Sequence, residues 1–431
     1  MTSTRGSRTG GRTSPGRPGD AYRGLAPLDR GRGGFGSSLG GRRTAGARLR
    51  GLARQAFARQ SPLRHLDWIL LAAVLALSLI GTLLVWAATE PGLAKAGEDT
   101  RTYLMKQLLN IALGLAFMMA VALLDYRRLR LYAPVLYGLS CLGLLVVLTP
   151  LGSIVNGAYS WISLPGGFQI EPSEYAKLSI ILMTAMLLGE LRQGEKRPRL
   201  RAAGYALGFA AVPIVLVEAE PDLGVVILML ALIIGLIALS GVRLYWLAAG
   251  LGAAVLAVIA VINLHLIRAY QLDRLTAFLH PSADPQGTGY SAAQAKIAIG
   301  DGGWLGQGLF HGQLVAGNFV PEQHTDFIFA VAGEELGFVG CALIIALLGL
   351  VLLRALRIAA RADDQFGMLV AAGVAIWFGV QSFVNIGMTM GIMPVTGLPL
   401  PFVSYGGSAI FADMIAVGAL QAVYRHRTVF T

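Results

Sequence analysis

Residues 222–241 read DLGVVILMLALIIGLIALSG, an apolar run with one charged residue, which stands at its start. A run of this length and composition indicates a helix that crosses a lipid bilayer. Similar runs recur along the 431-residue chain, which is 55% hydrophobic and only 14% charged. This composition excludes a soluble enzyme and predicts an all-α integral membrane protein.

The apolar runs predict about ten transmembrane helices after residue 64. The predicted segments are 67–88, 103–124, 132–149, 173–191, 202–218, 222–241, 244–266, 325–353, 367–390 and 407–424. Arginine clusters follow every second segment. Because such basic loops stay in the cytoplasm, we expect both termini inside and loop 267–324, between the seventh and eighth helices, outside.

Residues 1–64 differ in composition from the rest of the chain. They contain 14 Arg and 2 Asp, a balance of +12, which leaves −1 for everything after them. The segment is rich in Gly, Ser and Pro, so we expect a disordered cytoplasmic tail held near anionic lipid. Because the positive charge belongs to this tail, it does not indicate nucleic-acid binding. The chain is therefore expected to divide into the tail and a membrane domain, residues 65–431.

Loop 267–324 is far longer than a connector needs to be, which indicates a functional segment. It contains Asp284-Pro285-Gln286-Gly287-Thr288-Gly289-Tyr290. The proline biases Asp284 toward extended backbone, and the glycines let the chain turn closely. A carboxylate fixed in this way could act as a general base on an alcohol. An Asp-Pro turn is also a structural device, and the residues alone favour that interpretation.

Four other ionisable or polar residues lie at predicted helix starts. Glu174 and Lys177 are three residues apart, which puts them on one helix face where they can pair. The pair could hold a polar head group or could be a structural ion pair, and the spacing does not decide. Thr325 is the predicted N-cap of the eighth helix, with Asp326 in its first turn.

Further features concern the predicted outer side. Asp222 is expected to cap the sixth helix. Of Glu334 and Glu335, at least one must face protein or a cavity, because adjacent helix positions diverge by about 100°. Lys296 lies in the apolar stretch 292–299, which predicts a short interfacial or re-entrant helix. The Gly- and Pro-rich segment 394–408 predicts irregular backbone lining a cavity that opens outward.

Six segments recur in the order found in one family of membrane proteins. They are Asn156-Gly157-Ala158 with Trp161-Ile162, Glu171 through Lys177, Pro221 through Gly224, Asp284-Pro285 with Gly287 and Gly289-Tyr290, Pro321 through Phe329, and Thr396 through Gly407. This set resembles the SEDS family of cell-wall glycosyltransferases, the RodA, FtsW and SpoVE proteins, and spans nearly everything after the tail. Segment 391–407 is more similar to RodA, the elongation member.

The resemblance implies polymerisation of lipid II, the undecaprenyl-pyrophosphate-linked disaccharide-pentapeptide, into glycan strands at a bacterial cell membrane. Asp284 is then the expected catalytic base, acting on the acceptor 4-hydroxyl while undecaprenyl pyrophosphate leaves. A class B penicillin-binding protein is the expected transpeptidase partner. The expected substrate-binding residues are Lys106, Glu174, Lys177, Arg274, Lys296, Glu322, His324, Asp326, Ser404 and Tyr405. The charge on the leaving group calls for basic side chains or a divalent cation such as Mg²⁺ or Mn²⁺, although no carboxylate spacing specifies a metal site.

The chain departs from the family pattern at several positions. Ser160 and Lys106 stand where arginine is usual, and Glu171 and Glu220 stand where glutamine is usual. The resemblance implies that these departures alter contacts with the head group of the substrate.

Two other functions are compatible with the predicted helices. A flippase for lipid-linked precursors would suit the intramembrane charges, but the sequence shows no convincing inverted repeat. The charged residues that such a transporter could use are Glu174, Lys177, Glu334, Glu335 and Asp413. The other alternative is an inert scaffold for the wall machinery.

Overall fold

The computed structural model describes residues 65–150, 152–155, 158–163, 169–190, 200–242, 252 and 288–430. The helices are α2 (Trp68–Ala96), α3 (Thr102–Leu123), α4 (Tyr126–Val147), α5 (Pro172–Gly189), α6 (Leu200–Ala219), α7 (Leu223–Leu239), α10 (Thr288–Asp301), α11 (Gln313–Ala316), α12 (Ile328–Ala360), α13 (Gln365–Thr389) and α14 (Gly407–Phe430). The strands are β1 (Gly152–Val155), β2 (Ala158–Ser163) and β3 (Gln169–Ile170). All described residues belong to one compact unit, Gln55–Thr431.

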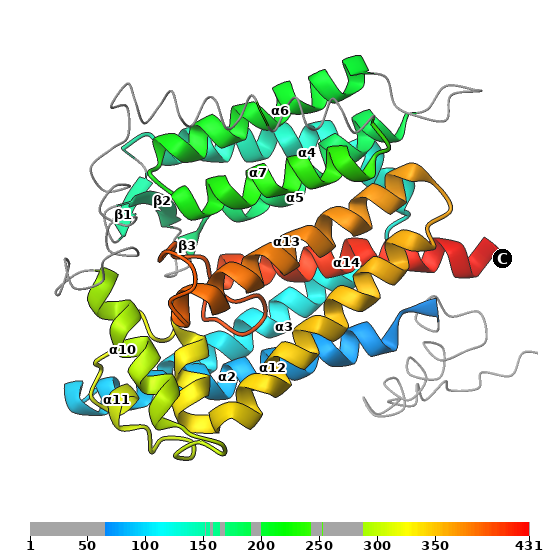
Figure 1. The fold of residues 1–431 in the computed structure, drawn as a ribbon. Helices are drawn as coiled ribbons and strands as arrows, with labels where there is room; N and C mark the ends of the chain where they lie inside the picture. The colour runs from blue at the N-terminus through cyan, green and yellow to red at the C-terminus, as the bar shows by residue number, and fades with distance from the viewer. Residues whose placement is uncertain are drawn as a thin grey trace, which may run out of the picture. The chain divides into compact units, whose positions relative to one another are not determined.

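The long helices of this unit lie side by side and run between two common ends (Figure 1). α14 packs along α3, α12 along α2 and α13, and α4 along α5, while α5, α6 and α7 contact one another. Among the described residues, seven helices are long and apolar enough to cross a membrane: α2, α3, α4, α6, α12, α13 and α14. The described helix α7 is apolar but shorter, with 17 residues. The prediction of a mainly helical membrane protein is confirmed. The predicted segment 244–266 lies outside the described residues except for residue 252, and the tail and residues 267–287 lie outside them too.

Aspartates begin several of these helices. The carboxylate of Asp67 accepts a hydrogen bond from the Leu70 N–H at 3.1 Å, which starts α2. Asp222 does the same for the Val225 N–H at 3.0 Å, so its predicted role as the cap of α7 is confirmed. Such caps satisfy backbone donors that the first helical turn leaves without partners.

The start of α4 lies six residues earlier than the predicted 132. The Asp125 side chain accepts a hydrogen bond from the Arg127 N–H at 3.1 Å and begins the helix at Tyr126. The arginines that follow therefore belong to the first turns of the helix, where the sequence analysis placed a loop.

The predicted N-cap of the eighth helix is wrong. α12 begins at Ile328, and the Thr325 hydroxyl lies in the preceding turn, where it donates to the Glu322 carbonyl at 3.2 Å. α12 is also broken at Gly337, whose φ of 65° and ψ of −164° are not helical. The Phe338 N–H on the far side of the break donates to the Gly303 carbonyl at 2.9 Å. The segment after α10 thus satisfies backbone groups that the break exposes.

Glu334 and Glu335 precede this break and both are buried. The Glu334 carboxylate accepts the N–H groups of Leu314 and Val315 at 2.7 and 3.0 Å. Glu335 accepts the Phe310 N–H at 3.3 Å. The prediction that at least one of them faces protein is confirmed, and both hold the chain between α10 and α12.

A small antiparallel sheet, in the order β1-β2-β3, lies between α4 and α5. Ile162 of β2 is paired with Gly152 of β1 and Ile170 of β3. The sequence analysis treated 150–172 as an outer loop, so the prediction of an all-α protein needs this correction. β1 (GSIV) and β2 (AYSWIS) lack the strict apolar–polar alternation that identifies a strand, and β3 has only two residues.

The arginine clusters gather at one end of the helices. Arg354, near the end of α12, forms an ion pair with Asp67 at the start of α2, with 2.6 Å between nitrogen and oxygen. Arg425, in the last turns of α14, donates to the Leu123 carbonyl at the end of α3 at 3.0 Å. The structure therefore brings together the ends that the sequence analysis assigned to one side of the membrane.

The middle of α2 contacts the irregular segment 391–406 through Gly81. A Cβ at this glycine would lie 2.4 Å from the Val403 carbonyl oxygen, whereas a Cβ at Gly92 of the same helix would meet nothing within 4 Å.

We therefore expect Gly81→Ala to lower the free energy of unfolding by about 1–3 kcal/mol, because the added methyl overpacks a fixed backbone contact. Gly92→Ala is the matched control and should be neutral or slightly stabilising. Unfolding midpoints of the two variants in detergent measure the difference. Equal midpoints would contradict this close approach.

Candidate functional site

A cavity of about 880 Å³ opens at the end of the helices opposite the arginine clusters. Its wall is formed by α3, strands β2 and β3, the starts of α5 and α7, residues 322–326 and the segment around 397–411. The ionisable residues that line it are Tyr103, Lys106, Glu171, Glu174, Asp222, Glu322, His324, Asp326 and Tyr405. The sheet that the sequence did not predict thus forms part of this wall.

One side of the cavity is apolar. Leu109, Leu113 and Phe117 follow one another at four-residue spacing on α3, which places them on one helix face. Phe411 of α14 meets Phe117 edge to face, with 5.4 Å between ring centroids. The cavity therefore joins a polar, charged region to an apolar groove between two helices, a combination that suits an amphipathic ligand.

Beneath the polar region lies the predicted ion pair. Lys177 Nζ is 2.6 Å from Glu174 Oε2, and both side chains are at most 1% exposed. Lys177 Nζ also donates to Gln381 Oε1 at 3.1 Å and lies 4.8 Å from the centre of the Trp377 ring. Glu174 lines the cavity and Lys177 does not, so the lysine fixes the carboxylate from behind.

An aromatic cluster forms the opposite part of the wall. The rings of Tyr103, His324 and Tyr405 lie with centroids 5.0 to 5.7 Å apart. Lys106 Nζ lies 5.6 Å from the centre of the Tyr103 ring. Burial lowers the pKa of His324, and the nearby Glu322 opposes that shift. The imidazole is therefore neutral at physiological pH, where it can both donate and accept a hydrogen bond.

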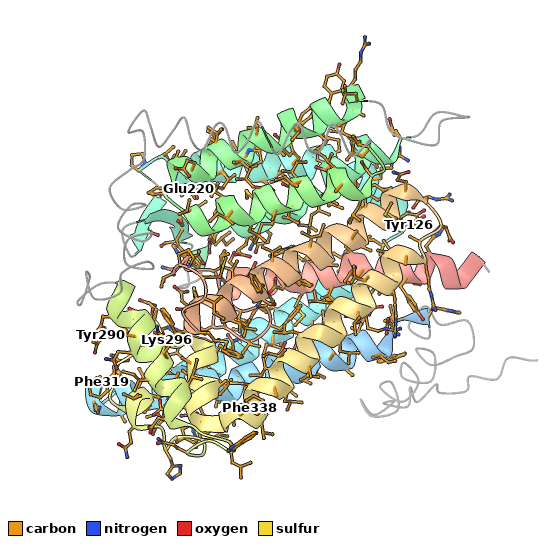
Figure 2. All side chains as sticks on the ribbon, viewed as in Figure 1. Tyr126, Glu220, Tyr290, Lys296, Phe319 and Phe338 are labelled. Atoms are coloured by element: carbon orange, nitrogen blue, oxygen red, sulfur yellow. The ribbon has the colours of Figure 1, made fainter. Side chains whose placement is uncertain are left out.

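Four carboxyl groups, those of Glu171, Glu174, Glu220 and Asp222, lie near the starts of α5 and α7. Burial, followed by the charges of Glu174 and Asp222, raises the pKa of Glu171 well above its usual value. Burial and the charge of Asp222 raise the pKa of Glu220 to about 8. Figure 2 places Glu220 at the α6–α7 turn, at the same end as Lys296. With a pKa of about 8, the Glu220 carboxyl therefore remains largely protonated at neutral pH.

Segment 391–406 is irregular, so the predicted irregular segment 394–408 is confirmed except for residues 407 and 408, which begin α14. Polar side chains hold its backbone. Ser404 Oγ donates to the Thr325 carbonyl at 2.6 Å and accepts the Leu400 N–H at 2.7 Å. Asn385 Nδ2, from α13, donates to the carbonyls of Asp326 and Leu398 at 2.8 and 2.7 Å. This part of the cavity wall is therefore fixed by hydrogen bonds to both neighbouring segments.

The structure brings most of the predicted binding residues together. Those that line the cavity are Lys106, Glu174, Glu322, His324, Asp326 and Tyr405. Ser404 and Lys177 lie directly behind the lining, where they position it. Lys296 is exposed on α10, and a Cβ at Gly391 would lie 3.0 Å from its Nζ. Arg274 and Asp284 lie outside the described residues.

The sequence analysis missed several amides that position this wall. Gln107 Nε2 donates to the Ser404 carbonyl at 3.3 Å, and Gln381 Nε2 donates to the Pro399 carbonyl at 2.8 Å. With Asn385, they are buried amides inside otherwise apolar helices. A polar side chain in an apolar helix is unfavourable unless it has a hydrogen-bond partner. The amides within these apolar runs could therefore have been recognised in the sequence as residues that bind another segment.

Comparison with known proteins identifies the family of this chain. The family model of the FtsW, RodA and SpoVE cell cycle proteins matches residues 67–429. The chain belongs to this family. The resemblance drawn from the sequence motifs is therefore confirmed, and seven apolar helices of spanning length make this family member a multi-pass protein of the bacterial cell membrane.

Individual relatives cover most of the chain. The peptidoglycan glycosyltransferase MrdB of Escherichia coli strain K12 is 40% identical over 364 residues, 84% of this chain and 94% of MrdB. The rod shape determining protein RodA of Thermus thermophilus has a TM-score of 0.61 at 29% identity over 84% of this chain and 97% of that one. A chain from a structure of a peptidoglycan synthase complex, described as coordinating polymerization and crosslinking, has a TM-score of 0.70 at 31% identity over 84% and 98%.

The buried Glu220 generates a pH-dependent prediction, because neither of its carboxyl oxygens has a hydrogen-bond partner among the described residues. Its pKa in the folded protein is about 8, above the usual value of 4.5. A raised pKa means that stability is fully present below the unfolded value and is lost as pH rises toward 8. Glu220→Gln should therefore raise the unfolding midpoint at pH 9 and leave it nearly unchanged at pH 4.5.

Midpoints measured at the two pH values test this prediction. Glu98→Gln is the matched control, the same change at an exposed carboxyl. An equal gain at both pH values for Glu220→Gln would show that its protonation does not depend on folding.

Proposed function

We propose that this protein is a peptidoglycan glycosyltransferase that polymerises lipid II into glycan strands during cell elongation. The observation that carries the proposal is the cavity, which joins a charged region to an apolar groove in a chain 40% identical to such a transferase. Lipid II has a charged part and an apolar part as well, because its sugar pyrophosphate is attached to a long polyprenyl chain. The groove formed by Leu109, Leu113, Phe117 and Phe411 suits the polyprenyl chain, and the polar lining suits the head group.

In the proposed reaction Asp284 removes the proton from the acceptor 4-hydroxyl, and the oxygen attacks the donor's anomeric carbon. The glycosidic bond forms as the bond to undecaprenyl pyrophosphate breaks, with inversion at that carbon. Asp284 stands four residues before α10, so four extended residues place it within about 14 Å of that helix start. α10 packs against α12, which follows the cavity-lining residues 322–326.

Positive charge is needed where the pyrophosphate leaves. Lys106 lines the cavity and is the described lysine best placed for this role, with Arg274, Lys177 and Lys296 as the other proposed sources. A divalent cation remains a proposal. Among the described residues no group of three His, Cys, Asp or Glu side chains could hold one.

We also propose the finer topology, with ten transmembrane helices in residues 65–431, a cytoplasmic tail 1–64 and loop 267–324 outside the cell. The gathering of arginines at one end supports this arrangement. The cavity then opens toward the outer face. Because a similar chain belongs to a complex of polymerization and crosslinking, we propose a class B penicillin-binding protein as the partner.

A lipid-precursor flippase is the alternative. Glu174, Lys177 and Glu334 were part of the argument for transport, and each now has a structural partner in the protein. This reduces the support for that alternative.

Asp284→Ala should lower polymer formation by roughly 10² to 10⁴-fold, the usual contribution of general base catalysis. The assay incubates the full chain and its transpeptidase partner with labelled lipid II and separates the glycan products. Asp301→Ala, an exposed carboxylate at the end of α10, is the matched control and should retain activity. Undiminished polymer from Asp284→Ala would contradict the catalytic role, and lipid II translocation without polymer would favour the flippase.

A further inference from the structure

A second lined recess lies at the arginine-rich end, far along the helices from the cavity. It is formed by Arg354, Arg357 and Arg361 of α12, by Ile358 and Ala362 beside them, and by Val423 and Tyr424 of α14. The arginines are spaced by three and four residues, so their side chains leave one face of the helix. Figure 1 shows the ends of α12 and α14 side by side at this point.

The positive charge of this recess is only partly compensated. Arg354 is neutralised by the buried Asp67 at 2.6 Å. In the part of the chain that the structure describes, Arg357 and Arg361 form no ion pair, and both are exposed. The nearby carboxylate of Asp363 lies 3.7 Å from His426 Nδ1. Within the described residues, two guanidinium groups one helical turn apart therefore lack a counter-charge.

The surroundings point to a lipid as the source of that counter-charge. Leu353 and Leu356, in the turn before Arg357, are 54% and 51% exposed on a helix of membrane-spanning length. Acyl chains would cover such leucines, while the arginines next to them lie where the apolar span ends. A guanidinium group binds two phosphate oxygens through two parallel hydrogen bonds, so a phosphodiester can supply the counter-charge of these arginines. Basic recesses between membrane helices bind anionic head groups by the same chemistry.

We propose that this recess is a binding site for the phosphate head group of an anionic phospholipid, with Arg357 and Arg361 as its direct ligands. The bound lipid would join the ends of α12 and α14. This site is separate from the cavity and does not depend on the proposed transferase activity.

The test compares the full chain with Arg357→Gln/Arg361→Gln in a neutral detergent. The matched control is Arg128→Gln/Arg201→Gln, two exposed arginines at the starts of α4 and α6 that do not line the recess. Both variants lose the same charge and keep the basic tail, so nonspecific attraction is common to them. Phosphatidylglycerol is titrated in mixed micelles while the unfolding midpoint is followed, and phosphatidylcholine and inorganic phosphate are titrated in parallel.

We expect phosphatidylglycerol to raise the midpoint of the unsubstituted chain and the control variant. The half-saturating concentration should increase roughly tenfold or more for Arg357→Gln/Arg361→Gln. An unchanged response of that variant, or an equal loss in the control, would overturn the site. A rise of the same size with inorganic phosphate would overturn the assignment to lipid and indicate a soluble anion. Native mass spectrometry of bound lipid gives a second readout that does not depend on the variant's own stability.

Discussion

Lys177 carries a positive charge in the interior of a membrane protein, and the surrounding structure is arranged to hold it there. The Lys177 side chain is fully buried, and its ammonium group lies against Glu174 and donates to Gln381. The Trp377 ring lies against the same ammonium group. Charges in such surroundings are stable only when paired and hydrogen-bonded, because desolvation costs several kcal/mol for each ion. Gln381 in turn donates to the Pro399 carbonyl, so the pair on α5 is connected through α13 to the irregular segment that walls the cavity. The position of Glu174 in the cavity follows from this chain of contacts.

The same segment is also held by contacts from α14 and α2. Asp413 of α14 accepts the N–H of Phe402 at 3.3 Å, and Phe402 has a φ of 65°, which a bulky residue rarely adopts. Gly81 of α2 allows the backbone at Val403 to approach closely. Several helices thus determine a wall that has no regular secondary structure of its own. A wall fixed in this way can present Glu174, His324 and Tyr405 to a ligand without rearrangement, which lowers the entropic cost of binding.

The apolar runs were sufficient to predict most of the helices, because length and composition decide whether a segment can cross a bilayer. The Glu174–Lys177 pair followed from a spacing of three, and the irregular outer segment followed from its glycines and prolines. Three features did not follow. The two longer strands of the β-sheet, β1 and β2, lack the apolar–polar alternation that indicates a strand. Helix α4 starts earlier than predicted because Asp125 caps it. The buried amides Gln107, Gln381 and Asn385 have partners far along the chain, so only the fold shows what they bind.

The most direct test of this account measures the coupling between Glu174 and Lys177 by unfolding Glu174→Gln, Lys177→Met and the double variant in detergent. Removing one partner leaves an uncompensated buried charge, so Lys177→Met should cost about 3–5 kcal/mol of the free energy of unfolding. The double variant removes both charges and should recover a large part of that loss. Additive effects of the two substitutions would contradict the claim that the buried pair holds the cavity wall in place.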